Sequence, residues 1–152
     1  MSNHLNTTAD ITVSIGTAHT AGTWEYAPLR EGIDTIEEAV NSQNQQYFFM
    51  NNQGFAHNEV TGMAPQYTVS GKRVYGDKAQ DYICGLKYQL GEARKTSVKL
   101  EWTDNSGEAA QTVTIVCDAT ILDISDLGGA TTDNTPFSCV IALDGKPEVT
   151  RA

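Results

Sequence analysis

Apolar and polar residues alternate with a period of two over most of this chain, which predicts β-strands. The first clear case is the run in which polar residues separate Ile11, Val13 and Ile15. Similar patterns cover the ranges 23–29, 66–75, 96–102, 109–118, 120–125 and 137–143, with a last short one around Val149. Turn-forming residues separate these runs. The pattern therefore predicts a mainly β chain, an antiparallel β-sandwich or barrel.

One segment has helical periodicity instead. Asp77 and Gln80 are spaced as a capping box, and Gly91 stands where a glycine commonly ends a helix. Between them, apolar residues recur on one face of a 3.6-residue helix. We therefore expect one flanking α-helix over about 77–90, with an apolar stripe of Ala79, Tyr82, Ile83, Leu86 and Leu90.

Two further segments are less clearly patterned. Ile33, Ile36 and Val40 have helical spacing, but the run is short and lacks a strong cap, so helix and strand both remain open. The polar run Asn41–Gln46 has no period and leads into the apolar cluster Tyr47–Met50. Within a single domain of 1–152 with a flexible N-terminus (1–9), we expect 41–65 to be a long loop or arm. It either folds back on its own domain or docks on a neighbour.

Composition supports strands and limits the function. The 152 residues include 18 threonines, which fit a pleated strand, and carry a net charge of −9. The net charge is −6 over residues 1–60, +3 over 61–102 and −6 over 103–152. Such blocks suit a subunit that binds copies of itself through oppositely charged surfaces. Alternatively, the blocks mix in the folded structure and form no separate charged surfaces. The acidic total argues against a protein that grips nucleic acid.

Targeting signals and disulfides are not expected. No apolar run is long enough for a membrane span, and the first residues lack the basic and apolar regions of a signal peptide. Cys84, Cys117 and Cys139 are odd in number and far apart, so we expect reduced thiols.

No catalytic, metal or cofactor motif stands out. His4, His19 and His57 lack metal-ligand spacing, and the adjacent Glu37 and Glu38 project in different directions, a poor arrangement for an acid/base pair. We therefore expect no enzyme, no metal site and no cofactor. Four aromatic residues could line a sugar-binding face, or serve as core and interface residues: Trp24, Tyr26, Tyr47 and Trp102.

Several strings occur in a recognisable order. The range 67–83 reads YTVSGKRVYGDKAQDYI, preceded by PLREGI at 28–33, the aromatic cluster at 47–49, GFA at 54–56 and EVTG at 59–62. The range 143–149 reads LDGKPEV. Together these strings resemble the major tail tube proteins of long-tailed, siphovirus-type bacteriophages of Gram-positive hosts. Lys78 departs from the proline frequent there in the family, but it is compatible with a helix.

The resemblance implies a β-sandwich whose strands join a continuous barrel in a hexameric ring. Stacked rings would form the tail tube of a virion assembled in the host bacterial cytoplasm. The expected partners are further copies of the chain and the tape measure, tail-tip and tail terminator proteins. Genomic DNA would pass through the lumen without specific binding, and no membrane is involved. The alternatives are the inner tube of a contractile tail or injection particle, and a carbohydrate-binding β-sandwich module.

The resemblance also suggests site residues. In the family the segments corresponding to Ile33–Val40 and Gln66–Arg73 contribute to the inner barrel, which favours a strand for the first. From polarity and alternation we expect lumen-facing side chains at Asp34, Glu37, Glu38, Gln66, Thr68 and Ser70. The expected inter-subunit or inter-ring contacts are Tyr47, Phe48, Phe49, Met50, Phe55, Lys72 and Arg73. A negative bore would repel phosphate and let DNA slide.

A charge reversal tests this expectation. Glu38→Lys should leave ring assembly intact but impair DNA passage, measured as infectivity of particles carrying the variant. Normal infectivity would contradict the lumen position.

Overall fold

The computed structural model describes residues 5–105 and 107–152. The described residues form ten strands, one α-helix and three short 3-10 helices, η1 (Thr8–Asp10), η2 (Met50–Asn52) and η3 (Gly91–Arg94). The expected flexible N-terminus lies partly outside these residues, since 1–4 are not described. No described helix is long and apolar enough to cross a membrane.

Eight strands form one antiparallel sheet in the order β2-β1-β7-β8-β9-β6-β3, with β10 paired to β8. This confirms the predicted fold class. The bounds are β1 Thr12–Thr20, β2 Thr23–Pro28, β3 Ile33–Ala39, β6 Gln66–Lys72, β7 Lys95–Asp104, β8 Gln111–Ser125, β9 Pro136–Leu143 and β10 Glu148–Arg151. Residues 33–39 are thus a strand, as the resemblance favoured, and not a helix.

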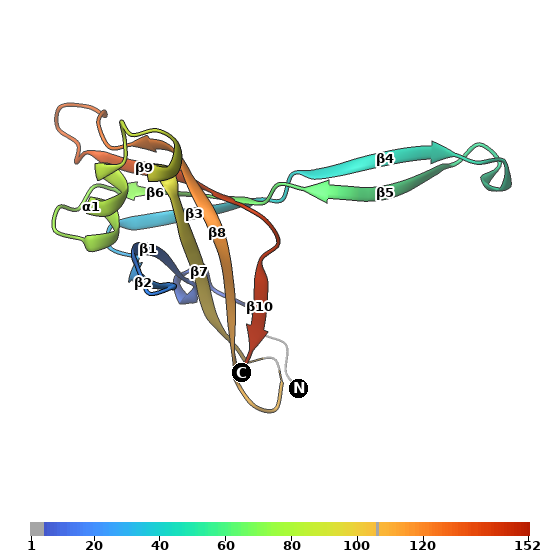
Figure 1. The fold of residues 1–152 in the computed structure, drawn as a ribbon, viewed down its shortest axis with the longest axis horizontal. Coiled ribbons are helices and arrows are strands. Elements are labelled where there is room, and N and C mark those ends of the chain that lie inside the picture. Colours follow the sequence, from blue (N-terminus) through green and yellow to red (C-terminus); the bar gives the residue numbers. More distant parts are fainter. Residues whose placement is uncertain (1–4, 106) are drawn as a thin grey trace.

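The sheet folds over on itself around a single apolar core. In Figure 1, β3, β6 and β9 run along the long axis, whereas β7 and the 15-residue β8 cross them steeply. The helix α1 (Lys78–Gly85) packs against β1, β2 and β8. Fully buried aliphatic side chains come from every layer, among them Ile15, Val69, Ile83, Val98, Ile121 and Ile141.

The predicted helix is wrong at its C-terminal end. It stops at Gly85, and Leu90, expected on its apolar stripe, is 89% exposed. Glycine is a weak helix former, and the guanidinium of Arg94 bonds the carbonyl oxygens of Lys87 (2.7 Å) and Gln89 (2.9 Å). Those carbonyls are therefore held in a turn outside the helix. Gly91, expected to end the helix, begins η3.

The range 41–65, expected as a loop, is largely a β-hairpin. Strands β4 (Ser42–Phe48) and β5 (Ala56–Met63) form a separate two-stranded sheet that projects from the body (Figure 1). We call residues 42–63 the arm. The polar run has no apolar period because nearly all of the arm is exposed. Its main chain still pairs, and Asn44 and Gln46 both donate to Asn58 Oδ1 at 3.2 Å.

The side-chain amide of Gln80, on α1, is fully buried and joins three segments of the chain. Its Nε2 donates to the carbonyl oxygens of Glu31 (2.8 Å) and Lys72 (3.1 Å), and its Oε1 accepts from the main-chain nitrogen of Val74 (2.9 Å). The capping box is therefore half confirmed. Asp77 accepts from the Gln80 nitrogen at 3.1 Å, but the Gln80 side chain does not return to Asp77.

Two glycines let the same segments approach closely. A Cβ on Gly71 would lie 2.1 Å from the carbonyl oxygen of Gly32. A Cβ on Gly32, whose φ is +74°, would lie 2.6 Å from the carbonyl oxygen of Lys72. Only glycine fits at either position, because the obstructing atoms are backbone.

Replacing the buried amide should destabilise the fold strongly. We expect Gln80→Leu to lower the free energy of unfolding by about 2–4 kcal/mol, because it leaves buried main-chain groups without partners. The measurement is chemical denaturation followed by tryptophan fluorescence. The matched control is Gln89→Leu, at an exposed glutamine four residues beyond α1, which should change stability by less than about 0.5 kcal/mol. Equal losses in the two variants would refute the role of Gln80.

Candidate functional site

The sheet is open, with β2 and β3 at the two ends of its strand order and the short β10, paired only to β8, as a further edge. Strand β3 pairs with β6 along one side, from Ile33 opposite Gly71 to Ala39 opposite Gln66. In the described part of the chain nothing pairs with its other side. An unpaired edge presents a row of main-chain donors and acceptors that another chain can extend.

One face of the β8–β9–β6–β3 sheet looks away from the core and is made mostly of small and polar side chains. The register places Glu37 beside Thr68, which in turn lies beside Val140, and it places Thr35 beside Ser70, which lies beside Ser138. We call this the outer face; it comprises Thr35, Glu37, Ala39, Gln66, Thr68, Ser70, Ser138, Val140, Ala142, Thr120 and Leu122. The register thus brings four predicted lumen residues together: Glu37, Gln66, Thr68 and Ser70.

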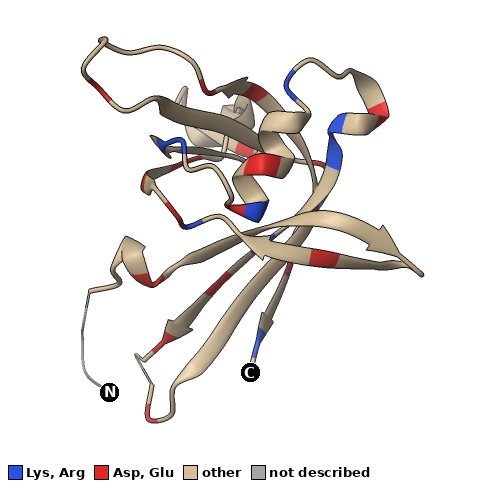
Figure 2. Cartoon of the chain, turned by 90° about the vertical axis from the view of Figure 1, so that its left-hand side faces the viewer, with Lys and Arg blue, Asp and Glu red and all other residues tan. Residues whose placement is uncertain are grey.

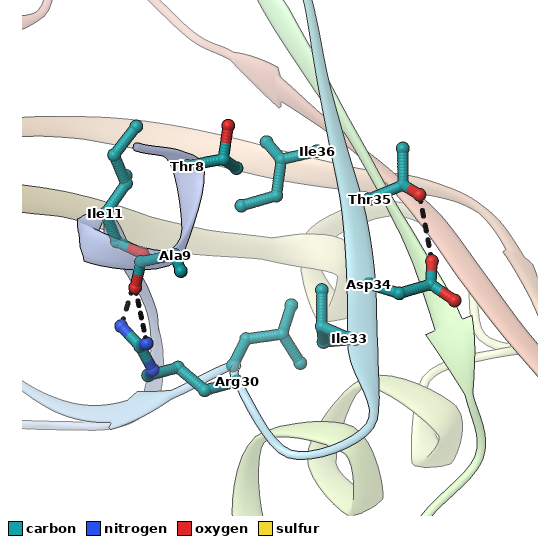
Figure 3. Close-up of a pocket in the computed structure, with 9 residues that line it drawn as sticks. Thr8, Ala9, Ile11, Arg30, Ile33, Asp34, Thr35 and Ile36 are labelled. Atoms are coloured by element: carbon teal, nitrogen blue, oxygen red, sulfur yellow. Dashed lines mark hydrogen bonds between the residues drawn. The ribbon is translucent and has the colours of Figure 1, made fainter. Parts of the chain in front are cut away.

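Asp34 joins this face through an irregularity in β3. The register shifts between Ile33 and Thr35, so that Asp34 and Thr35 follow one another without a change of side. Figure 3 shows both pointing to the same side of β3, with the Thr35 hydroxyl donating to Asp34 at 2.9 Å, while Ile33 and Ile36 point to the other side.

Glu38 departs from the expectation. It pairs with Tyr67, whose side chain is buried on the core side, and its carboxylate accepts a 2.8 Å hydrogen bond from the Tyr67 hydroxyl. Burial raises the pKa of Tyr67, and this hydrogen bond raises it further. The hydroxyl therefore keeps its proton and remains a donor. Strand alternation places Glu37 and Glu38 on opposite faces. Glu38 therefore does not share the outer face with Glu37, and the expected effect of Glu38→Lys on DNA passage does not follow from its position.

The β9 half of the outer face was missed from the sequence. Ser138, Val140 and Ala142 alternate with the buried Phe137, Cys139 and Ile141. This alternation was visible in the sequence. The alternation did not show which of the two sets of side chains points outward, because each set contains apolar residues.

A small pocket of about 170 Å³ lies between η1 and β3 (Figure 3). Its lining is mainly aliphatic, with a few polar residues from η1 and β3, and its one basic residue, Arg30, is already engaged. The Arg30 guanidinium donates to the Ala9 carbonyl (2.6 Å) and the Thr12 hydroxyl (2.9 Å). This contact fixes η1 to the body and leaves no catalytic arrangement among the lining residues.

The tip of the arm carries the exposed apolar cluster that the sequence indicated. Met50 is 98% and Phe55 76% exposed, and the ring of Tyr47 stacks on that of Phe49 at 5.5 Å. Phe48, Val60 and Met63 are also exposed; the sequence prediction did not include the last two. So much apolar surface on a two-stranded hairpin is typical of a binding site for another chain.

Of the two predicted basic contacts, Lys72 is exposed but Arg73 is not available. The Arg73 side chain is only 6% exposed and donates to Asp81 Oδ1 at 2.9 Å, to the Val74 carbonyl at 2.7 Å and to Gln80 Oε1 at 3.4 Å. These contacts are all internal to the subunit, and they give no support to the predicted inter-subunit contact at Arg73. Neither Asp81 nor Gln80 can be assigned as its partner from the sequence alone.

The charge blocks do not persist as separate surfaces. Ion pairs join the basic middle block to the acidic last block, with Lys87 at 2.7 Å from Asp126 and Lys95 at 3.4 Å from Asp144. Figure 2 shows acidic and basic residues interspersed at the α1 end of the molecule. The second interpretation of the blocks, mixing in space, is the one the structure supports.

The remaining candidate chemistry is dispersed. His19 stacks on Trp24 at 4.6 Å, His57 lies 2.6 Å from Glu59 on the arm, and His4 lies outside the described residues. Among the residues described, no three metal-ligating side chains cluster. The cysteines are unpaired, and burial raises the pKa of the Cys84 thiol to about 11.

The four aromatic residues do not form one binding face. Trp24 and Tyr26 lie on β2, Trp102 packs against the core, and Tyr47 lies on the arm. Tyr26 is engaged within the body, where its hydroxyl is 2.8 Å from the Ser97 hydroxyl. A sugar-binding platform would need such rings side by side.

Comparison with solved structures identifies the fold. The tube-terminating cap of the anti-feeding prophage matches with a TM-score of 0.65 at 15% identity, over 100% of this chain and 95% of that one. The tail of an empty gene transfer agent particle, with C6 symmetry, matches at 0.68 and 10% identity, over 96% and 99%. The sheath–tube complex of an extracellular contractile injection system matches at 0.60 and 12%, over 96% and 91%. The chain therefore has a tail-tube-like fold.

Sequence comparison adds nothing further. No known protein-family profile matches the chain, and neither does any curated protein sequence. The structural matches do not favour a siphovirus of Gram-positive hosts over other tube-bearing particles.

Proposed function

We propose that this chain is a structural subunit that assembles with copies of itself into rings, and that the rings stack into the tail tube of a phage or phage-like particle. The observation that carries the proposal is the open β3 edge beside a polar outer face. Edge-to-edge pairing between copies would close the sheets into a continuous barrel and remove the unpaired edges. The fold match to tail-tube chains supports this arrangement.

The outer face suits the wall of a conduit. It carries one carboxylate in its centre, Glu37, and a second, Asp34, next to Thr35 near the start of β3, among hydroxyls, amides and apolar groups. A face without cationic side chains at its centre gives phosphate nothing to bind, so DNA would pass without sticking. We propose Asp34, Glu37, Gln66, Thr68 and Ser70 as lumen residues, together with Thr35 and Ser138.

The C6 symmetry of the gene transfer agent tail leads us to propose rings of six. Tape measure, tail-tip and tail terminator proteins are the proposed partners within the virion, after assembly in the host cytoplasm. We propose no catalytic activity, cofactor or membrane contact.

A second candidate is the inner tube of a contractile tail or injection particle. It is favoured because contractile injection systems are among the structures matched. The siphovirus assignment depends on the sequence resemblance alone. The two candidates share the subunit role and differ in whether a sheath surrounds the tube.

Electron microscopy tests the subunit role. We expect negative-stain images of the purified protein at rising concentration to show rings and hollow tubes, with matching high-mass species in size-exclusion chromatography. A strictly monomeric protein that bound a glycan array would contradict the proposal and favour the carbohydrate-binding alternative.

Charge reversal at adjacent residues tests which face lines the bore. Glu37→Lys assemblies should retain short duplex DNA at about 50 mM salt and release it by about 200 mM, because lysines in the lumen would neutralise phosphates. The matched variant Glu38→Lys places its charge on the opposite face and should add no DNA binding, although losing the Tyr67 hydrogen bond reduces stability. DNA retention is measured by co-sedimentation with the assemblies. Stronger binding by Glu38→Lys would contradict the proposed lumen face.

A further inference from the structure

The N-terminal segment lies along β3, the strand whose open edge carries the proposed ring closure. Residues 5–11, which include η1, are exposed or half-buried, and η1 contributes no buried residue to the core. We call residues 5–11 the latch. Among the described residues, no main-chain hydrogen bond joins the latch to β3. The latch therefore lies beside the edge without completing the sheet.

Two hollow spaces separate the latch from the body. The first, of about 170 Å³, is the pocket in Figure 3, between Ala9 of the latch and residues 33–36 of β3. The second, of about 270 Å³, begins at Asn6 of the latch and lies between the β3–β6 side of the sheet, with Glu38, and the β7–β8 side, with Trp102. Most of the other side chains that line it are aliphatic or aromatic. The latch therefore covers apolar surface that it does not fill.

The first hollow reaches the free side of β3. Asp34 and Thr35 line it, although Figure 3 shows both side chains on the side of β3 that faces away from the latch, so their main chain forms this part of the wall. Among the described residues that line this hollow, none belongs to β6, which pairs with the other side of the strand. A strand that paired with the free side of β3 would lie about 4.8 Å away, and every second side chain would point into the space beside the latch.

A single side chain, that of Arg30, holds the latch by hydrogen bonds. Its Nη2 donates to the Ala9 carbonyl at 2.6 Å. Its Nη1 donates to the Ile11 carbonyl at 3.3 Å and to the Thr12 hydroxyl at 2.9 Å. The main-chain carbonyl of Arg30 accepts from the Ile33 nitrogen at 3.1 Å, which fixes Arg30 to the turn that begins β3. Because Arg30 is exposed, water can replace these bonds at little net cost, and the latch is held reversibly.

We propose that the latch is an autoinhibitory contact: while Arg30 holds it, it obstructs pairing of a second copy with the β3 edge, and its release precedes ring closure. This inference rests on the proposed tube function and concerns the regulation of the same edge. An open edge strand invites uncontrolled pairing, and proteins commonly protect such edges with a covering loop. Because the latch forms no main-chain bonds with β3, its release breaks only the Arg30 bonds and the packing of the half-buried Ile11.

Substitution of Arg30 tests the latch in the full-length chain. We expect Arg30→Gln to raise the initial rate of assembly at least fivefold, measured by light scattering at one protein concentration, with rings and tubes verified by electron microscopy. Arg30→Lys keeps the charge but loses the forked donor, and should assemble at an intermediate rate. The matched control is Arg151→Gln, which removes the charge of another exposed arginine, 3.0 Å from Asp104, and should assemble as the unmodified protein does.

Hydrogen exchange in the unmodified protein supplies the second measurement. The main-chain nitrogens of Asp10 and Ile11 donate to the carbonyl oxygens of Thr7 and Thr8 at 2.9 and 3.0 Å, within η1. A single helical turn is not stable in water without other contacts, so release of the latch should remove these bonds. We expect both amides to exchange at least tenfold faster in assembled tubes than in the free subunit. The buried Val98 on β7 is the control and should stay protected in both.

The outcomes separate this inference from the proposed function. Tubes that form at an equal or lower rate with Arg30→Gln, or in which the η1 amides stay protected, overturn the latch and leave the tube function standing. If the unmodified protein and Arg30→Gln form neither rings nor tubes at any concentration, both proposals are overturned. Faster assembly of Arg30→Gln, together with lost η1 protection in tubes, supports both.

Discussion

Three main-chain groups from the turn before β3, the end of β6 and the segment before α1 meet at one buried side chain, the amide of Gln80. Buried polar groups of the backbone need partners, and a single amide supplies two donors and one acceptor in the required directions. The glycines Gly32 and Gly71 allow the segments to approach closely enough for these bonds. The helix is thereby fixed to the edge of the sheet that carries the candidate site.

This arrangement explains what the sequence signature does. Within the range 71–83, Gly71 provides the close approach, Arg73 bonds Asp81, Asp77 caps the helix and Gln80 ties the segments together. Each role is internal to the subunit. The string therefore specifies how the β6–α1 corner folds, and the surfaces proposed for assembly lie elsewhere, where the sequence is less distinctive.

Three surfaces follow from that rigid corner: the β3 edge, the outer face of the β8–β9–β6–β3 sheet, and the arm that continues β3 and β6. Two of them are unsatisfied in a single copy, the β3 edge through unpaired main chain and the arm through exposed apolar side chains. Pairing between copies would satisfy both, and the outer face would remain exposed as the proposed wall of the bore. A lone subunit is in this sense an incomplete structure, in agreement with a tail-tube-like fold.

The sequence by itself determined most strands of the large sheet, the capped start of the helix and the apolar arm tip, because local periodicity and capping act between near neighbours; it left β3 open between helix and strand. It missed the end of α1, where Arg94 captures carbonyls that a longer helix would use, and the pairing of Asn41–Gln46, which depends on main-chain bonds to β5. Only the tertiary structure separated Glu37 from Glu38 and enclosed Arg73, because register and distant partners decide which face a side chain occupies.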